Sequence, residues 1–554
     1  MNADDFTTVH DAFRAAAEAV PDKAFLAVPP RASRDYDAEG RDITYDEARV
    51  AVESLIALYR EGGYGLGHRV ALLMENRPEH FFHLLAFSAL GISAVPINPE
   101  YTHDEMLYQM AHSEADLAIA LPARMAELEA VGKARGTALP VVDGVSLPVS
   151  LPRAPQPPRE GPPRNAKPER ASELGLYYTS GTTGRPKGCI TTNDYFLKAG
   201  QCYLEVARKG IIAITDGEER LLNPLPLYHM NSGILSFTAM ILSKNCQIQP
   251  DRFHPSTWWH KVAESRASII HYLGVVPPML LNQPESPDEK RHCIKWGLGA
   301  GIEPELHARF EARFGFPIAE GWGMTETGCI FSATENPRHI GTRAFGRPNA
   351  RMEGRIVDED DVEVARGVAG ELLVRTPGPD PRVGFFAGYL KDATATEEAW
   401  RGGWFHTGDT VIQREDDMFI FVDRKKNIIR RSGENIAAAE VEACIAGDDR
   451  VAQIAVIAAP DELREEEVMA CIVPMPGTLI EGTGGEEALA DDLMALCLEK
   501  LAYYKAPGWW LFLDQLPTTG TQKVQKTEIF PKGEDPTKRP GIIDRRDRKK
   551  RVKR

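Results

Sequence analysis

Residues 177–188 (YYTSGTTGRPKG) have the composition of an anion-binding loop. Gly181 and Gly184 lack side chains, so backbone N–H groups beside them can approach an anion closely. Lys187 adds a positive charge near the end of the loop. Hydroxyl donors come from four further residues, Thr179, Ser180, Thr182 and Thr183. The loop could therefore cradle a phosphate, although a flexible turn has a similar composition.

The loop is not a Walker P-loop, whose pattern is G-x-x-x-x-G-K-[ST]. Lys187 does not directly follow the second glycine, and Gly188 stands where that pattern needs Ser or Thr. A phosphate-binding role would therefore depend on a different arrangement of the same groups.

Six further segments carry chemically suggestive residues in chain order: PLYHMN (226–231), GAG (299–301), GWGMTETG (321–328), GWFHTGD (403–409), DRKKNIIRRSGENI (423–436) and TGTQKVQK (519–526). With the loop, which fits T-S-G-[ST]-T-G-x-P-K-G at every position, they resemble the motifs of the adenylate-forming superfamily. That superfamily contains acyl-CoA synthetases, luciferases and peptide-synthetase adenylation domains. The resemblance spans residues 7 to 531 and is nearest to the carnitine/crotonobetaine–CoA ligase group.

The resemblance implies a ligase with two half-reactions. A carboxylate attacks the α-phosphate of ATP and forms acyl-AMP with release of pyrophosphate; the thiol of coenzyme A then displaces AMP. The first step brings two anions together, so the site must supply positive charge and aligned donors. The implied partners are a small carboxylic acid, ATP, Mg²⁺ and coenzyme A.

Three residues would act at the reacting groups. Lys523 matches the lysine that bridges the acyl carboxylate and the α-phosphate. Glu326 matches the Mg²⁺ ligand, and Thr325 would donate its hydroxyl to the α-phosphate. Plainer roles exist for each residue type: a surface lysine, and a Thr-Glu helix start.

The same resemblance implies a nucleotide site. Asp409 would accept hydrogen bonds from the ribose hydroxyls, Arg424 would lie near the ribose, and Trp322 would flank adenine unless it is a core aromatic. The implied ATP/AMP set is Thr179, Ser180, Gly181, Thr182, Thr183, Gly184, Lys187, Gly299, Ala300, Gly301, Gly321, Trp322, Gly323, Thr325, Asp409, Arg424 and Lys523.

The family's second half-reaction uses a rotated C-terminal domain. The hinge position falls on Lys426, and Gly433 would line the pantetheine tunnel, where a missing side chain lets the thin arm pass. Two positions depart from the usual pattern: Asn193, where many relatives have His, and Asn427, where acidic residues are frequent. Neither departure removes a group that the chemistry needs.

We expect the acyl pocket to be lined by small, polar and apolar residues together. Its candidate walls are His229, Met230, Asn231, Val275, Gly299, Gly321, Met324 and Cys329, with His229 also a candidate catalytic residue. This mixture favours a short to medium acid, with aromatic and polar acids among the candidates.

The alternative is a stand-alone adenylation enzyme that loads a carrier protein. PLYHMN offers no acid to hold an α-amine, and too few residues follow Lys523 for a carrier domain.

The elements that must position these residues suggest an α/β protein with a large N-terminal domain and a small mobile C-terminal domain. The expected order is residues 1–423, a hinge at 424–427, a C-terminal domain at 428–535 and a basic tail at 536–554, whose last part, residues 545–554, is expected to be a frayed, solvated end. Residues 69–75, 79–91 and 92–98 suggest strand, helix and strand of a parallel sheet. Residues 304–314 form an amphipathic helix pattern ended by Gly315, and residues 355–375 suggest two paired strands.

Composition restricts the function classes. A chain of 554 residues with a net charge of −15 is long enough for several domains and is a poor match for nucleic acid. Eight scattered cysteines without a C-x-x-C pair predict reduced thiols in a cytoplasmic protein. The apolar stretch 81–97 contains His83, Ser88, Ser93 and Pro96, so we expect a buried helix and strand there and no membrane span. The oligomeric state is left open.

Overall fold

The computed structural model describes residues 1–155, 166–179, 186–424, 427–431, 434–461, 464–478, 485–501, 503–518, 524–531 and 533–549. Contacts divide the chain into two compact units. Unit 1 contains Met1–Gly354 and Val374–Phe405, and unit 2 contains Arg355–Leu373 and His406–Arg554. This division groups residues 355–373 and 406–423 with the C-terminal part, so the predicted hinge at 424–427 lies inside unit 2 and stays a prediction.

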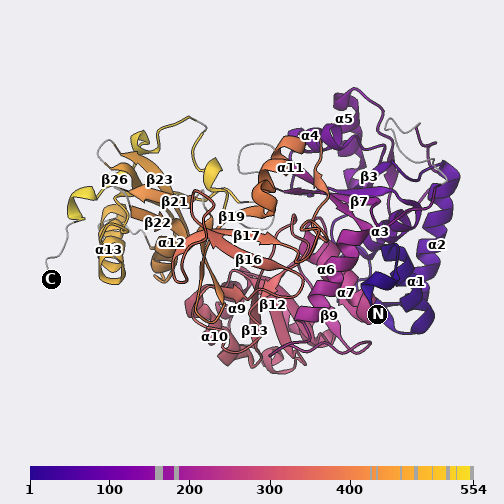
Figure 1. The fold of residues 1–554 in the computed structure, drawn as a ribbon, viewed down its shortest axis with the longest axis horizontal. Coiled ribbons are helices and arrows are strands. Elements are labelled where there is room, and N and C mark those ends of the chain that lie inside the picture. Colours follow the sequence, from indigo (N-terminus) through magenta and orange to yellow (C-terminus); the bar gives the residue numbers. More distant parts are fainter. Residues whose placement is uncertain are drawn as a thin grey trace. The chain divides into compact units, whose positions relative to one another are not determined.

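Unit 1 contains a seven-stranded sheet (Figure 1). Its order is β18 (Gly388–Tyr389), β8 (Lys187–Thr192), β7 (Glu173–Thr179), β4 (Ser93–Pro96), β3 (Arg69–Leu73), β5 (Leu117–Ala120) and β6 (Val141–Asp143). The predicted strand–helix–strand order is confirmed, because β3 and β4 are parallel and joined through α3 (Pro78–Leu90). Both α3 and β4 are largely buried, as expected for the apolar stretch. None of the helices in the described ranges has the length and apolarity needed to cross a lipid bilayer.

Unit 1 also contains an eight-stranded sheet. Its order is β14 (Phe331–Ser332), β13 (Ile318–Trp322), β12 (Trp296–Ala300), β11 (Ile269–Leu273), β9 (Arg220–Leu222), β10 (Cys246–Ile248), β1 (Ala24–Val28) and β2 (Arg41–Thr44). The strands β9 to β13 are parallel, so their carboxyl ends, where the GAG and GWGMTETG segments begin, meet at one edge. Such edges are where open α/β sheets bind ligands.

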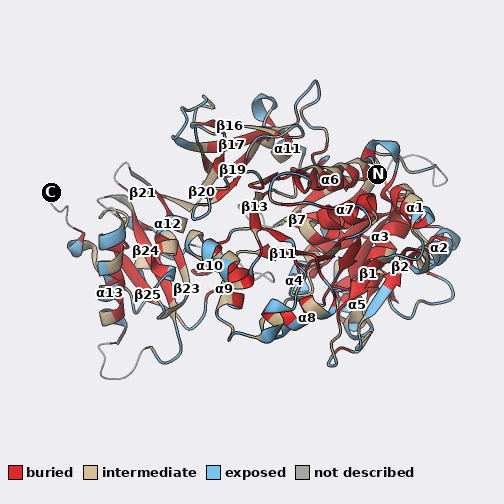
Figure 2. Cartoon of the chain, turned by 90° about the horizontal axis from the view of Figure 1, so that it is seen from below, coloured by how far each residue is buried: buried red, intermediate tan, exposed pale blue. Residues whose placement is uncertain are grey.

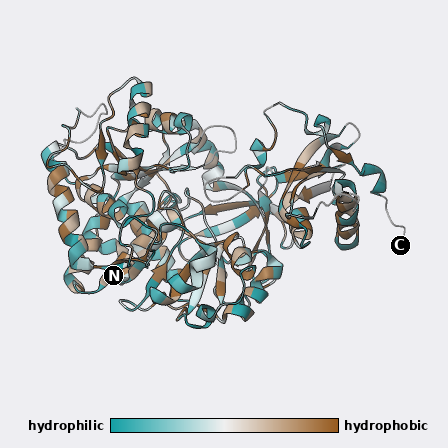
Figure 3. Ribbon diagram, turned by 180° about the vertical axis from the view of Figure 1, so that it is seen from behind, coloured by the Kyte–Doolittle hydropathy of each residue, from teal (hydrophilic) through white to brown (hydrophobic). Residues whose placement is uncertain are grey.

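Helices of unit 1 pack their apolar sides on these sheets. They are α1 (Val9–Ala19), α2 (Tyr45–Gly62), α4 (His103–Ser113), α5 (Met125–Arg135), α6 (Asn193–Val206), α7 (Phe237–Ser243), α8 (Trp258–Glu264), α9 (Val276–Leu281), α10 (Pro304–Phe314) and α11 (Ala393–Ala399). The predicted helix α10 is confirmed, with Phe310 and Phe314 buried and Gly315 ending it at a φ of +83°. That left-handed conformation favours glycine at the helix end. Figures 2 and 3 show buried and hydrophobic residues gathered on the strands and on the covering sides of the helices.

Unit 2 is built largely from two further sheets. Strands β20 (Phe419–Arg424), β19 (Phe405–Gln413), β17 (Ala369–Arg375) and β16 (Glu353–Val357) lie side by side in that order. The neighbouring β16 and β17 confirm the predicted strand pair in residues 355–375. The C-terminal sheet has the order β22 (Glu434–Ala437), β21 (Ile428–Arg431), β24 (Glu465–Pro474), β25 (Trp509–Phe512) and β26 (Ile543–Asp544), and β23 (Val451–Asp461) also pairs with β24. Helices α12 (Ala438–Ala446) and α13 (Gly485–Lys500) contribute to its core.

The C-terminal tail is not frayed over residues 545–549, contrary to the expectation from sequence. Strand β26 pairs with β25, and three arginines after it form ion pairs on unit 2: Arg545 with Asp491, Arg546 with Asp461, and Arg548 with Asp491. Lys549 is buried against Glu467. The tail's charges are neutralised by acidic groups of the folded domain, which a count of basic residues along the chain does not reveal.

Candidate active site

The ends of the glycine-rich loop are held together in unit 1. Residues Ser180, Gly181, Thr182, Thr183 and Gly184 lie outside the described residues. Thr179 ends β7 and Lys187 begins β8, and the antiparallel register pairs the two residues directly. The hydroxyl of Tyr108 donates to the carbonyl of Pro186 at 3.0 Å. The loop therefore leaves and re-enters the sheet at one point, between two neighbouring strands.

Glu326 lies beside that point and has a partner that the motifs did not include. Its carboxylate Oε1 accepts a hydrogen bond of 2.9 Å from the hydroxyl of Tyr389, which is in β18. The ammonium of Lys187 lies 4.7 Å from the centroid of the Tyr389 ring and 3.7 Å from the Asp392 carboxylate. Tyr389 thus lies between the two charged groups: its ring faces the ammonium of Lys187, and its hydroxyl bonds the buried carboxylate of Glu326.

The protonation of Tyr389 follows from its surroundings. Burial, and secondly the negative charge of Glu326, raise the pKa of its hydroxyl well above 10. The phenol therefore keeps its proton and donates to Glu326 throughout the physiological range. Burial, and secondly the charge of Glu326, also raise the pKa of the adjacent Cys189 thiol, so no second anion forms next to the carboxylate.

The backbone around Thr325 and Glu326 is anchored from two sides. The hydroxyl of Tyr195 in α6 donates to the Thr325 carbonyl at 2.6 Å. The N–H of Phe386 donates to the Glu326 carbonyl at 2.9 Å. These contacts fix the turn while the Thr325 side chain stays half-buried.

The turn after β12 contains Gly299, Ala300 and Gly301. A Cβ on Gly299 would lie 2.4 Å from the carbonyl oxygen of Tyr272, so a larger residue would force β11 and β12 apart. Gly301 has a φ of +84°, and its N–H donates to the Glu320 carboxylate at 2.8 Å. That carboxylate also accepts from the Tyr272 hydroxyl, and burial raises the pKa of Glu320. Glu320 and Tyr272, which the motif comparison did not select, therefore fasten this turn to β13.

Trp322 has the surroundings of a core aromatic residue. Its ring is 8% exposed and lies 5.8 Å from the Phe331 ring and 5.9 Å from the Phe345 ring, measured between centroids. Gly321 is half-buried and Gly323 exposed on either side of it. The adenine contact of Trp322 stays a prediction.

The predicted acyl-pocket residues come from several elements of unit 1. His229 and Met230 precede a π-helix, Asn231–Ser236, a rare conformation that is often found at functional sites. Val275 precedes α9, while Met324 and Cys329 lie on either side of Glu326. Burial lowers the pKa of His229 to about 4, so its imidazole is neutral near pH 7. His229 can therefore exchange hydrogen bonds with an acyl group but supplies no positive charge.

A buried polar cluster orients Asn231. Its side-chain Oδ1 receives a hydrogen bond from the His271 Nδ1 at 2.7 Å and another from the Asn223 amide at 3.0 Å. Burial lowers the pKa of His271 to about 3, so the ring is neutral. Because an amide oxygen can only accept, the contact with Asn231 assigns the proton to His271 Nδ1. Nε2, which lies 2.8 Å from the Tyr203 hydroxyl, is then the acceptor of that hydroxyl. With two donors on Oδ1, the Asn231 amide presents its own N–H groups away from the cluster.

The predicted ribose residues lie in unit 2. The antiparallel register of β19 and β20 places Asp409 directly opposite Arg424. Asp409 is 3% exposed, and its backbone N–H donates to the Thr407 hydroxyl at 3.1 Å. Lys426, Gly433 and Lys523 lie outside the described residues.

Asp423, which was not among the predicted site residues, connects the segments on either side of the predicted hinge. One carboxylate oxygen accepts from the Asn427 side-chain amide at 3.1 Å, and the other accepts from the Ala439 N–H at 2.8 Å. The neutral amide of Asn427 is thus suited to a position beside a buried carboxylate, where an acidic residue would be repelled. This contact gives a physical reason for one departure from the family pattern.

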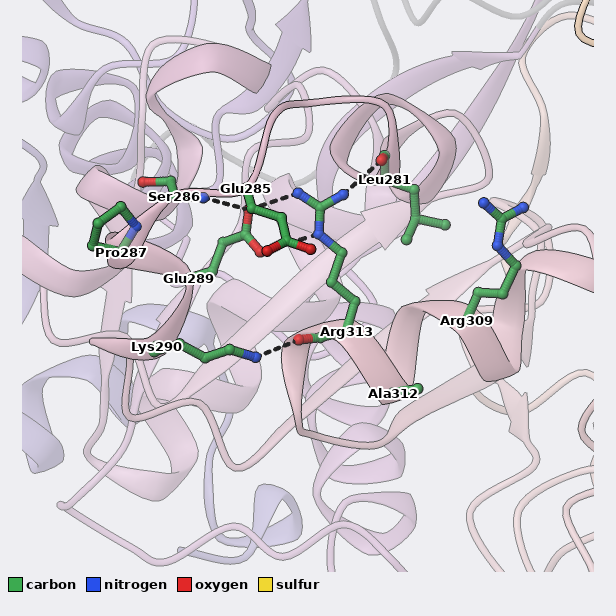
Figure 4. Close-up of a pocket in the computed structure, with 9 residues that line it drawn as sticks. All are labelled: Leu281, Glu285, Ser286, Pro287, Glu289, Lys290, Arg309, Ala312 and Arg313. Atoms are coloured by element: carbon green, nitrogen blue, oxygen red, sulfur yellow. Dashed lines mark hydrogen bonds and ion pairs between the residues drawn. The ribbon is translucent and has the colours of Figure 1, made fainter.

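Figure 4 shows a separate pocket of about 870 Å³ that includes residues of α10. One of its charged groups is bound within the pocket: the Arg313 guanidinium donates to Glu289 at 2.7 Å and to the Leu281 carbonyl at 2.6 Å. Lys290 donates to the Arg313 carbonyl at 2.6 Å. None of the predicted site residues lines this pocket, and its volume alone does not indicate a ligand.

Two family models match the chain. The model described as AMP-binding enzyme matches residues 13–390, and the model described as AMP-binding enzyme C-terminal domain matches residues 440–523. Sulfoacetate–CoA ligase of Cupriavidus necator is 30% identical over 522 residues, covering 92% of this chain and 95% of that protein. Crotonobetaine/carnitine–CoA ligase of Proteus mirabilis is 27% identical over 515 residues, covering 88% and 93%.

Solved structures share the fold at lower identity. ATP-bound MatB of Rhodopseudomonas palustris has a TM-score of 0.77 and 22% identity, with 95% of this chain and 98% of that chain covered. The o-succinylbenzoate CoA synthetase of Bacillus subtilis bound to its acyl-adenylate also has a TM-score of 0.77 and 22% identity, with 94% and 97% covered. These likenesses confirm the predicted adenylate-forming fold, with its large N-terminal and small C-terminal domains.

Proposed function

We propose that this chain, which belongs to the AMP-binding enzyme family, acts on a short to medium polar or aromatic acid. Its reaction is that of an ATP-dependent acid–CoA ligase that works through acyl-AMP. The carboxylate displaces pyrophosphate from ATP, and the thiol of coenzyme A then displaces AMP. The substrate class is the part of this proposal that pocket residues must decide, because fold and family do not determine it.

The orientation of Asn231 is the observation that carries the substrate class. Its Oδ1 is occupied by His271 and Asn223, so its amide offers donors to a ligand. A donor held in place by a buried network favours an acid with an oxygen in its acyl part, because an apolar chain would leave the amide unpaired. The relatives include ligases for sulfoacetate, crotonobetaine or carnitine, and indoleacetate, which are polar or aromatic acids.

The Glu326–Tyr389–Lys187 cluster suits the triphosphate side of the reaction. Mg²⁺ in phosphate-transfer sites is commonly held by one or two carboxylates together with substrate phosphates and water. Glu326 fits that requirement as a buried carboxylate whose Oε1 is oriented by Tyr389. Mg²⁺ bound there would offset negative charge on the phosphates. Lys187 would bring a positive charge to the pyrophosphate leaving group, and Thr325 a hydroxyl to the α-phosphate.

Residues of unit 2 would complete each half-reaction in turn. Asp409 and Arg424, opposite each other on β19 and β20, would bind the ribose. Lys523 would hold the carboxylate and the α-phosphate during adenylation. Movement about residues 424–427 would then replace Lys523 by the segment that contains Gly433, along which the pantetheine arm would pass.

The alternative, a stand-alone adenylation enzyme that loads a carrier protein, is not favoured. The full-length curated relatives named above are CoA ligases. Asn231 and its neighbours in the 226–231 segment provide no carboxylate for an α-amine. His229 does not replace it, because its imidazole is neutral near pH 7 and carries no negative charge.

A carboxylate panel tests the proposal directly. Purified protein is incubated with ATP and Mg²⁺, with and without coenzyme A, and with sulfoacetate, crotonobetaine, carnitine, indoleacetate, benzoate and straight-chain fatty acids of two to twelve carbons. Pyrophosphate release and acyl-CoA mass are measured. We expect thioester from polar or aromatic acids. A preference for long unsubstituted chains would overturn the substrate class, and pyrophosphate release without thioester would point to another acceptor.

A further inference from the structure

One face of α4 carries acidic and aromatic side chains. Asp104, Glu105 and Tyr108 are three and four residues apart, so they share that face of the helix. With Tyr101, just before the helix, and Tyr178 of β7, they line a pocket of about 210 Å³ in unit 1. The described residues that line this pocket include none of those predicted to bind ATP, the acid or coenzyme A.

The aromatic walls of this pocket are held in place through groups outside it. The hydroxyl of Tyr108 donates to the Pro186 carbonyl at 3.0 Å, and that of Tyr178 lies 2.9 Å from the Nδ1 of His112. The Tyr108 ring also stacks on the His112 ring, with 5.3 Å between centroids. Burial raises the pKa of Tyr101 to about 12, so its phenol stays neutral. These tyrosines therefore offer the pocket mainly the electrons of their rings.

Gln109 lines the same pocket and has an unused acceptor. Its side chain belongs to a residue that is only 1% exposed, and its Nε2 donates to the Pro96 carbonyl at 3.0 Å. Its Oε1 has no hydrogen-bond partner among the described residues. A buried amide oxygen without a donor is unfavourable, so a ligand that brings an N–H group would satisfy it.

The charge around this pocket is negative. Asp104 and Glu105 are exposed carboxylates in the first turn of α4, and Glu105 also accepts from the Thr102 N–H at 2.7 Å as part of the helix cap. No basic side chain is among the described residues that line the pocket. Burial lowers the pKa of the neighbouring His112, so its ring is neutral near pH 7. The pocket thus combines carboxylates, ring faces and an amide oxygen.

We propose that this pocket binds a small protonated amine that has at least one N–H donor. Carboxylates and tyrosine rings both attract a positive charge. The unpaired oxygen of Gln109 selects an ammonium with N–H groups over a quaternary one. A bare metal ion would leave the ring-lined walls without a contact. The volume is below the roughly 300 Å³ at which pockets begin to hold drug-sized ligands, so an amine of about four to six heavy atoms fits.

The test titrates the full-length protein with n-butylamine at pH 7 and follows the ligand by NMR. Butan-1-ol, tetramethylammonium chloride and potassium chloride are titrated in parallel, because they lack the charge, the N–H donor and the carbon chain respectively. The variants are Gln109→Met and Asp104→Asn. Glu129→Gln is the matched control, since it removes an exposed carboxylate of α5 that does not line the pocket.

We expect saturable binding of n-butylamine with a dissociation constant of about 1 mM, which a ligand of this size can reach. Gln109→Met should weaken it about tenfold or more, because a hydrogen bond to a charged group is lost. Asp104→Asn should weaken it about two- to fivefold, and Glu129→Gln should leave it unchanged. If Gln109→Met fails to fold, Tyr101→Leu replaces it, with an expected loss of about two- to tenfold.

Four results would overturn the proposal. No saturable binding of n-butylamine below a concentration on the order of 10 mM would show that the pocket is only a solvent-filled gap. Equal affinity in all variants would place the binding elsewhere. Butan-1-ol or tetramethylammonium binding as tightly as n-butylamine would show that the charge or the N–H donor is not recognised. Displacement of n-butylamine by an equal concentration of potassium would indicate a metal-ion site.

Discussion

The Tyr389 hydroxyl donates a 2.9 Å hydrogen bond to the Glu326 carboxylate while the ring of the same tyrosine faces the ammonium of Lys187. One side chain therefore connects the end of the glycine-rich loop to the proposed Mg²⁺ ligand. The phenol stays protonated because burial and the nearby carboxylate both raise its pKa. It can orient Glu326 without competing with a metal for negative charge.

Tyr389→Phe should slow adenylation by about tenfold to a hundredfold, because a hydrogen bond to a charged group contributes about 1.5–3 kcal/mol. The Mg²⁺ concentration for half-maximal pyrophosphate release should rise as well. Tyr36→Phe, which removes a hydroxyl bonded to the Asn76 carbonyl, is the control. Equal rates and equal Mg²⁺ dependence in wild type and Tyr389→Phe would contradict the orienting role.

Lys523→Ala should abolish acyl-adenylate formation, because the charge that bridges the carboxylate and the α-phosphate is lost. Thioester formation from supplied acyl-adenylate should continue at a rate within a few-fold of wild type. Rapid-quench measurement of each half-reaction distinguishes the two steps. Lys526→Ala is the matched control, because Lys526 belongs to the same motif as Lys523 but pairs with Glu442. Equal loss of both steps in Lys523→Ala would count against the assigned role.

Gly433→Leu should show the opposite pattern. A side chain at this position would obstruct the pantetheine arm, so thioester formation from supplied acyl-adenylate should fall by about a hundredfold or more. Adenylation should change little. Gly477→Leu, at a glycine of the same unit in the turn after β24, is the control for placing a leucine side chain in this unit. Selective loss of adenylation in Gly433→Leu would refute the tunnel assignment.

Asn231→Leu should lower kcat/KM for a polar acid of the panel by about ten- to a hundredfold relative to an apolar acid of the same length. The replaced amide would no longer donate to the acyl oxygen, and His271 would lose its acceptor. Asn231→Asp should be worse for anionic acyl groups, because it adds a like charge. Ratios of kcat/KM that stay constant across the panel would show that Asn231 does not select the acid.

Acid should destabilise unit 1 through buried histidines. Burial lowers the pKa of His80 and His271 to about 3 and that of His83 to about 4, whereas an unfolded histidine has a pKa near 6.5. Between pH 6.5 and pH 4 the unfolded chain binds more protons, so the free energy of unfolding falls as pH falls. Each histidine should remove about 2 kcal/mol between pH 6.5 and 5.

Urea denaturation at pH 7, 6 and 5 measures this slope. His80→Leu is the informative variant, because the His80 Nε2 has no hydrogen-bond partner among the described residues and an apolar side chain can replace it. Its unfolding free energy should depend less steeply on pH than that of the wild type. An identical slope in both proteins would show that His80 does not titrate between the folded and unfolded states as its burial implies.

Local patterns in the sequence were sufficient for the fold class and much of the site. The alternation of strands and helices predicted β3, α3 and β4, and the spacing of Phe310, Phe314 and Gly315 predicted α10 and its end. Motif order identified Glu326, Lys187 and the glycine turn at 299–301 as site candidates. These features are readable because secondary structure and motif identity depend on residues close together along the chain.

Only the tertiary structure decided which groups are partners. Tyr389 lies 63 residues from Glu326, His271 lies 40 from Asn231, and Lys549 lies 82 from Glu467. Such pairs form because strands and helices that are distant in sequence share a core, and no local period or composition records them. The basic tail illustrates the point: its charge pattern suggests a solvated end, but acidic and aromatic groups elsewhere in unit 2 bind it and bury Lys549.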